Sequence, residues 1–138
     1  MNPKHREQAY HLAGIGHWEF ELENNVLYWS DEIKNLHDVP LDYQPTVEDA
    51  IAFYEKGENR RSVQKAVEGA IDNGEGYVIE AKIITAKGNE RWVKSIGEPV
   101  FENGQCIRLY GSTQDITAHK KREQKIKKQQ KKLNLLSR

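Results

Sequence analysis

The sequence predicts an α+β domain in which a five-stranded antiparallel sheet carries its helices on one face. Two strand patterns come first, a helical region follows, and three further strand patterns close the globular part of the chain. Asn103-Gly104 is the strongest hairpin signal, so the last two strands should be antiparallel neighbours. No internal repeat is found, and 138 residues suit one domain. A single antiparallel sheet with its helices gathered on one side accommodates this order of elements.

The N-terminal part of the chain predicts a short helix followed by a β-hairpin. Residues 1–14 have helical character and end at Gly14, a residue that commonly stops a helix. Trp18, Phe20 and Leu22 then alternate with polar residues, which is the period of a half-buried strand. After a turn at residues 23–25, residues 26–29 should return as the second strand.

The middle of the chain predicts three helices. Ser30 stands at the N-cap position of a short helix that ends before Pro40. Thr46 and Asp49 form a capping box that opens the next helix. A longer helix is expected over residues 59–71, where apolar residues recur at helical spacing, and Asn73-Gly74 should close it.

The remaining residues predict three strands and a basic helix. The strands are expected at residues 77–85, 91–101 and 107–116, with turns at Gly88-Asn89 and Asn103-Gly104. The folded domain should therefore span residues 15–117. A separate helix is expected over residues 118–138.

The net charge of zero is the sum of two oppositely charged parts. Residues 120–138 contain nine basic residues and one acidic residue, Glu123, so they carry +8. Residues 1–119 contain 12 basic and 20 acidic residues, so they carry −8. Such asymmetry separates a mildly acidic globular body from a basic tail.

The basic tail also has a thin apolar seam. With His119, Ile126 and Leu133 at heptad position a, position d holds Arg122, Gln129 and Leu136, so half of the six seam positions are apolar. This pattern fits a signalling coiled coil, a basic patch for nucleic acid or anionic lipid, or a solvated helix. The position directly after the last strand favours the signalling helix, so we expect no nucleic-acid partner.

Several classes of protein are disfavoured by what the sequence lacks. A single cysteine, Cys106, cannot form an internal disulfide or a cysteine cage for a metal, and it fits a reducing cytoplasm. No apolar stretch approaches the ~20 residues that span a bilayer, so we expect no membrane segment. The five histidines have no metal-site spacing, and no nucleophile elbow, phosphate loop or dinucleotide motif is present. We therefore predict no catalytic and no metal-binding residues.

Four short strings, in this order, resemble one family. Residues 12–21 (LAGIGHWEFE), followed by Tyr28-Trp29-Ser30, resemble the opening of a PAS sensor domain of the subgroup that begins with a Gly-x-Trp-x-x strand. Residues 88–93 (GNERWV) and 111–117 (GSTQDIT) resemble the C-terminal part of the same domain, the PAC motif. The resemblance covers about residues 8–119.

The resemblance implies a PAS fold with a small cavity between sheet and helices, a homodimer, and a sensory or interaction role without enzymatic activity. It implies a fragment of a bacterial-type signalling protein that perceives a small-molecule ligand or a partner. The signal would pass through the C-terminal helix to an output domain in cis, a histidine kinase or a diguanylate cyclase or phosphodiesterase. A ligand-free dimerisation scaffold is the alternative, and nucleic-acid binding through the basic tail is the third interpretation.

Two groups of residues are candidates for the functional site. A ligand should lie against the inward-facing positions of the third and fifth strands, which are Ile79, Ala81, Ile83, Gly111 and Thr113. The junction with the C-terminal helix consists of Asp115, Ile116 and Thr117, where a carboxylate or hydroxyl can cap the helix. The resemblance also suggests that Asp115 pairs with Arg91 or Lys94.

The identity of any cofactor is left open, but two cofactors are not expected. Haem-binding relatives take the axial histidine from the helix before the third strand, and residues 59–71 contain none. Light-oxygen-voltage relatives carry a reactive cysteine on the central helices, whereas Cys106 lies beside the Asn103-Gly104 turn. Thr113 also stands where those relatives keep a flavin-contacting glutamine.

Overall fold

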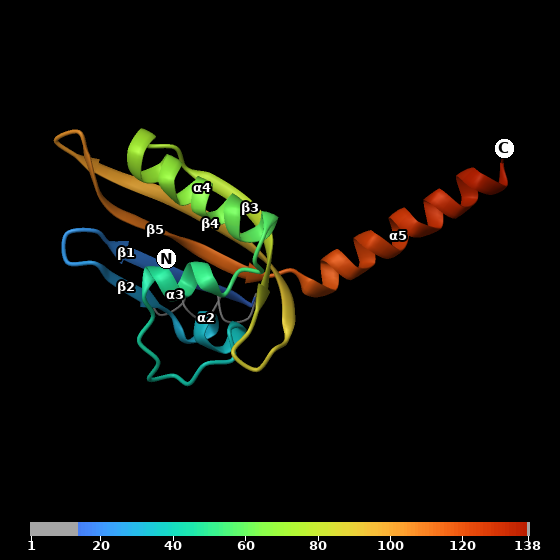
Figure 1. The fold of residues 1–138 in the computed structure, drawn as a ribbon, viewed down its shortest axis with the longest axis horizontal. Coiled ribbons are helices and arrows are strands. Elements are labelled where there is room, and N and C mark those ends of the chain that lie inside the picture. Colours follow the sequence, from blue (N-terminus) through green and yellow to red (C-terminus); the bar gives the residue numbers. More distant parts are fainter. Residues whose placement is uncertain (1–13, 138) are drawn as a thin grey trace, which may run out of the picture.

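A five-stranded antiparallel sheet forms the floor of the molecule in the computed structural model, which describes residues 14–137 (Figure 1). The sheet order is β2-β1-β5-β4-β3, so the N-terminal hairpin pairs with β5 of the three-strand unit. The predicted helix over residues 1–14 lies outside the described residues, apart from Gly14. The strands are β1 (Ile15–Glu21), β2 (Val26–Trp29), β3 (Tyr77–Ile84), β4 (Glu90–Glu102) and β5 (Gln105–Asp115).

The Asn103-Gly104 turn joins β4 and β5 as predicted. Both residues have positive φ, 53° and 78°, as a type I′ turn requires. The register shifts between Val100 and Phe101, which leaves Ile107 as an extra residue on β5. Every pair beyond this bulge is therefore displaced by one residue from the register that the turn alone would set.

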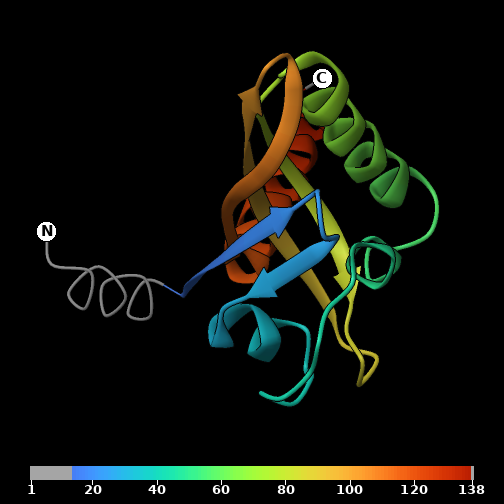
Figure 2. The ribbon, with the colours of Figure 1, turned by 90° about the vertical axis from the view of Figure 1, so that its left-hand side faces the viewer.

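Helices α2 (Asp31–Leu36), α3 (Val47–Ala52) and α4 (Glu58–Asn73) cover one face of the sheet (Figure 1 and Figure 2). Helix α4 ends at Gly74 in a left-handed conformation. The Thr46 hydroxyl accepts a hydrogen bond from the Asp49 N–H at 3.1 Å, which confirms the predicted cap. The Ser30 hydroxyl does not cap α2. It accepts the backbone N–H of His17 instead, at 3.0 Å, and so fixes the start of α2 to β1.

The core consists of two adjoining clusters. One lies between α4 and strands β3 and β4 and includes Leu36, Tyr54, Val63, Ala81, Ile83 and Val93. The other lies between the β1–β2 hairpin and helices α2 and α3, and its buried members are Trp29, Ile33 and Val39. Both clusters exclude water from the helix-covered face, which is the main source of stability for a domain of this size.

The last helix, α5 (Thr117–Leu136), projects away from the sheet (Figure 1). None of its residues is buried. No helix among residues 14–137 combines the length and the apolar character needed to cross a membrane.

Candidate functional site

A cavity of about 90 Å³ lies between the inner face of the sheet and helices α2, α3 and α4. Its wall is aliphatic and aromatic except for three polar side chains, His37, Ser95 and Thr113. The aromatic part of the wall comes from Trp18, Phe20, Trp29, Tyr54 and Tyr77. A largely apolar enclosure with a few polar groups is typical of small-molecule sites.

Of the five cavity residues expected from the sequence, only Thr113 lines this cavity. Ala81 and Ile83 are fully buried in the core cluster beside it, and Ile79 packs against the same cluster. Gly111 leaves no room for a side chain, because a Cβ atom there would overlap the Ile96 carbonyl oxygen. The inward-facing strand positions were therefore identified, but most of them pack together and leave no space.

His37 lines the cavity and was not singled out from the sequence. It follows the last residue of α2, and only 5% of its surface is exposed. Its ring stacks on Trp29 with centroids 4.3 Å apart, and Phe53 meets it edge-on. Its Nδ1 lies 2.8 Å from the carbonyl oxygen of Ile33 and must carry the proton, since a carbonyl only accepts.

Burial lowers the pKa of His37 to about 4. The hydrogen bond to Ile33 and the nearby charges of Arg91 and Asp38 only modify this effect. The ring is therefore neutral near pH 7. The helical spacing of Ile33, Leu36 and His37 could have indicated a buried position, but nothing in the sequence distinguishes a cavity-lining histidine from an exposed one.

Two buried hydroxyl groups face each other across β4 and β5. Ser95 and Thr113 are register partners, and their hydroxyl oxygens are 3.0 Å apart. The Tyr54 hydroxyl also forms a hydrogen bond with Ser95, which lowers the pKa of Tyr54. Burial has the larger effect and raises the pKa of Tyr54. Burial also raises the pKa of Tyr77. The polar part of the cavity wall therefore lies on the inner face of the sheet.

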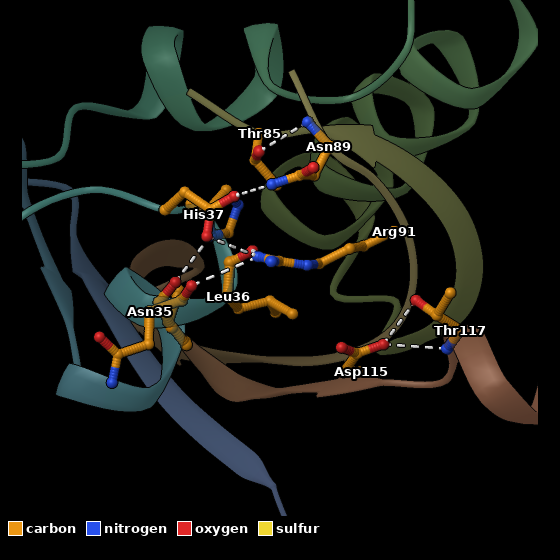
Figure 3. Close-up of polar contacts among 10 residues, drawn as sticks. Asn35, Leu36, His37, Thr85, Asn89, Arg91, Asp115 and Thr117 are labelled. Carbon is orange, nitrogen blue, oxygen red and sulfur yellow. Dashed lines mark hydrogen bonds and ion pairs between the residues drawn. The ribbon is translucent and has the colours of Figure 1, made fainter. Parts of the chain in front are cut away.

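The residue at the N-cap position of α5 is Ile116, which has no side-chain cap, and the carboxylate of Asp115 just before it bonds to Thr117. Asp115 Oδ1 accepts two hydrogen bonds from Thr117, from the backbone N–H at 2.9 Å and from the hydroxyl at 2.6 Å (Figure 3). The Thr117 hydroxyl oxygen accepts the N–H of Trp92 at 3.0 Å, and the Ile116 N–H donates to the Trp92 carbonyl at 2.9 Å. The start of α5 is thereby attached to β4.

Arg91 does not pair with Asp115 as the resemblance suggests. Its guanidinium donates to the Leu36 carbonyl at 2.6 Å, at the C-terminal end of α2 (Figure 3). It also donates to Asp38 at 3.1 Å. The last carbonyl groups of a helix lack intrahelical partners, so a cation is favoured there. The pKa of Asp38 falls to about 2, through hydrogen bonds from Thr85 and Asn89 above all, and also from Arg91.

Lys120 forms a second attachment of α5 to the sheet. Its ammonium group lies 2.7 Å from a Glu80 carboxylate oxygen on β3 and 5.1 Å from the ring centre of Trp92. Each partner shifts the other, since the hydrogen bond lowers the pKa of Glu80 and raises that of Lys120. No sequence pattern singles out this contact, because it depends on how β3, β4 and α5 meet.

The described residues that could bind a cofactor or a metal ion lie away from the cavity or do not cluster. Cys106 lies at the start of β5 beside the turn and is not part of the cavity wall. Helix α4 contains no histidine. Within residues 14–137, no group of three or more His, Cys, Asp or Glu side chains could hold a metal ion.

Comparison with known proteins finds one family. The family described as the PAS fold matches residues 26–113. "Probable diguanylate cyclase DgcE" of Escherichia coli is 25% identical over 130 residues, which are 92% of this chain and 11% of that protein. "Blue-light-activated histidine kinase" of Brucella ovis is 30% identical over 112 residues, which are 81% of this chain and 22% of that protein. The chain thus spans a small part of the length of these relatives.

Solved structures show the same fold. A sensory box histidine kinase/response regulator from Burkholderia thailandensis has a TM-score of 0.75 at 21% identity, over 94% of this chain and 97% of that one. The N-terminal domain of a diguanylate cyclase with PAS/PAC sensor from Marinobacter aquaeolei has a TM-score of 0.69 at 18% identity, over 76% of this chain and 97% of that one.

Proposed function

Because this chain belongs to the PAS fold family, we propose that it is the sensory input domain of a larger signalling protein. One observation carries the proposal. Thr113 lines the cavity, and Asp115, two residues later on the same strand, holds the first turn of α5. A molecule that moves the cavity wall at Thr113 therefore acts on the attachment of the helix, and α5 can pass that change to an output domain in cis.

The output domain is proposed to be a histidine kinase or a diguanylate cyclase. Proteins with those names are similar to this chain over most of its length. The catalytic step would belong to that domain, and the part described here would act by binding and relay. We further propose that the domain is cytoplasmic, because its one cysteine needs no oxidising compartment.

A homodimer is part of the same proposal. Ile126 and Leu133 lie one heptad apart on α5, and both are more than half exposed. Such residues gain burial when two copies of the helix pair along this seam. A dimer would also hold two output domains side by side.

The alternative is a dimerisation scaffold that holds no ligand. The small volume of the cavity supports this alternative, because modest side-chain movements would fill it. Native mass spectrometry of the purified chain, with an absorption scan, distinguishes the two. A bound small molecule supports sensing, and a dimer without one supports the scaffold.

The relay can be tested without knowing the ligand, by filling the cavity with a side chain. Ala50 lines the cavity, whereas Ala52 on the same helix is exposed. Ala50→Leu should change hydrogen exchange at the amides of Ile116, Thr117 and Lys120 by at least about three-fold. Ala52→Leu is the matched control and should leave these amides unchanged. Equal exchange at the start of α5 in both variants would contradict the relay.

A further inference from the structure

The cavity wall bears no charged side chain. All its residues lie in the described part of the chain, and none of them is Asp, Glu, Lys or Arg. The nearest charges that act on His37 belong to Arg91 and Asp38, which pair with each other at 3.1 Å. His37 itself is held in one tautomer by Ile33 and carries no charge near neutral pH. An ion moved into this space would lose its hydration without a partner of opposite charge, which is strongly unfavourable.

The Ser95–Thr113 pair leaves one hydrogen-bond donor unused. Each side chain has one hydroxyl proton, and one proton is used by the bond between the two oxygens. Tyr54 extends the pair to a chain of three hydroxyl groups joined by two bonds, so one proton remains unused at one end of this chain. No other hydrogen bond of these hydroxyl groups exists among residues 14–137. Since both Ser95 and Thr113 line the cavity and are only 6% exposed, an occupant of the cavity is the natural acceptor.

The volume limits the size of that occupant. In this measure one water needs about 10–15 Å³, so a space of about 90 Å³ holds several waters. A chain of four or five non-hydrogen atoms fits within this space. A flavin or a haem is many times larger and does not fit the cavity as it stands.

From these three properties we infer that the cavity takes a short, uncharged organic molecule with one hydroxyl or carbonyl group, about the size of a four-carbon alcohol. This inference deepens the proposed sensory function and rests on it. The apolar part of the molecule would lie against Trp29, Ile33 and Leu109. Its oxygen would accept the unused proton of the hydroxyl chain formed by Thr113, Ser95 and Tyr54. His37 adds a neutral, stacked surface to the wall.

Three probes of equal chain length test the charge requirement. Butan-1-ol, butyrate and butylammonium are titrated into the full chain, and binding is followed by NMR shifts of the cavity-lining residues. We expect butan-1-ol to bind at least about ten times more tightly than either ion. Binding of butyrate or butylammonium as tight as that of butan-1-ol would overturn the inference, as would the absence of any butan-1-ol shift at the cavity.

Paired variants test the role of the hydroxyl groups. The double variant Ser95→Ala with Thr113→Val should weaken butan-1-ol binding by about three- to ten-fold, whereas Thr113→Ser keeps a hydroxyl and should bind nearly as well as the parent chain. Xenon, which needs only an apolar cavity, reports whether each variant keeps the space. Equal affinity for butan-1-ol in the double variant and Thr113→Ser, with xenon binding retained, would show that the hydroxyl pair does not receive the ligand.

The outcome is separable from that of the relay experiment. Ala50→Leu tests coupling to α5 with no ligand present. If Ala50→Leu alters exchange in α5 while butan-1-ol does not bind, the ligand class is wrong and the relay stands. If butan-1-ol binds as expected while Ala50→Leu leaves α5 unchanged, the cavity is a ligand site that is not coupled to the helix.

Discussion

At the scale of single residues, His37 couples the cavity to the acidity of the solution. Its side chain is buried against Trp29 and Phe53, and its pKa is lowered to about 4, whereas an unfolded chain would have a value near 6.5. The unfolded state therefore binds a proton between these two values that the folded state does not bind. This contribution to stability is present above about pH 6.5 and is lost progressively as the pH falls towards 4.

We predict that His37 makes the free energy of unfolding fall by about 2–3 kcal/mol between pH 7 and pH 4.5. Urea unfolding of the parent chain and of His37→Phe over this range measures the effect. His37→Phe keeps an aromatic ring beside Trp29 but has no proton to bind, so its stability should vary much less with pH.

The control for this prediction is His119→Gln, which removes an exposed histidine on α5. Loss of the pH dependence in His37→Phe but not in His119→Gln would assign the effect to the buried ring. Asp38 does not interfere, because its lowered pKa of about 2 confines its loss of stabilisation to the range below about pH 4. The interpretation fails if His37→Phe and the parent chain lose stability equally between pH 7 and pH 4.5.

At the scale of secondary-structure elements, the junction between β5 and α5 depends on one carboxylate. Asp115 Oδ1 accepts both hydrogen bonds that Thr117 can direct to it, and Thr117 in turn accepts the N–H of Trp92. Removing the carboxylate leaves the N–H of Thr117 to be satisfied by water. The sheet itself keeps all its backbone pairs.

We predict that Asp115→Ala speeds hydrogen exchange of the Thr117 amide by about five- to ten-fold, as expected for one lost hydrogen bond. Exchange in the centre of β4 and β5 should not change. Asp72→Ala, which removes an exposed carboxylate near the end of α4, is the matched control. Protection of residues 117–122 that equals that of the Asp72→Ala variant would refute a capping role for Asp115.

The elements themselves were largely predictable from the sequence, because they depend on local patterns. The strands at 77–85 and 91–101 and the helix at 59–71 were expected within two residues of their observed bounds. Asn103-Gly104 correctly specified the hairpin. Thr46 correctly marked a cap, since its partner lies only three residues away.

The site was less predictable, because it depends on register and on contacts between distant segments. The Asn103-Gly104 turn alone would place Lys94 opposite Thr113, whereas the bulge places Ser95 there and creates the hydroxyl pair. Arg91 likewise has no sequence signal that directs it to Asp38, 53 residues away. The bulge and the end of α2 are tertiary features, so they became visible only in the folded molecule.

At the scale of the whole molecule, the zero net charge separates into a body and a helix of opposite sign. The part up to residue 119 carries −8 and residues 120–138 carry +8. Lys120 and Glu80 join the two parts at their boundary, but beyond this point α5 has no buried residue. The body should therefore fold without the helix, and the helix should contribute mainly to association.

We predict that deletion of residues 120–138 lowers the dimer fraction while the sheet keeps its fold. Sedimentation velocity at micromolar concentration measures the first effect and circular dichroism the second. Ile126→Ala with Leu133→Ala in the full chain should lower the dimer fraction in the same direction, because these are seam residues. If the truncated chain remains fully dimeric, association depends on the body.

The order of strands has one further consequence. Ile15, the first residue of β1, pairs with Gln114 near the end of β5, so the chain enters and leaves the sheet at neighbouring points. A fold with adjacent entry and exit can be inserted between two segments of a longer polypeptide without forcing them apart. For the same reason, the domain should tolerate insertion into other proteins. It should also tolerate circular permutation with little rearrangement of the sheet.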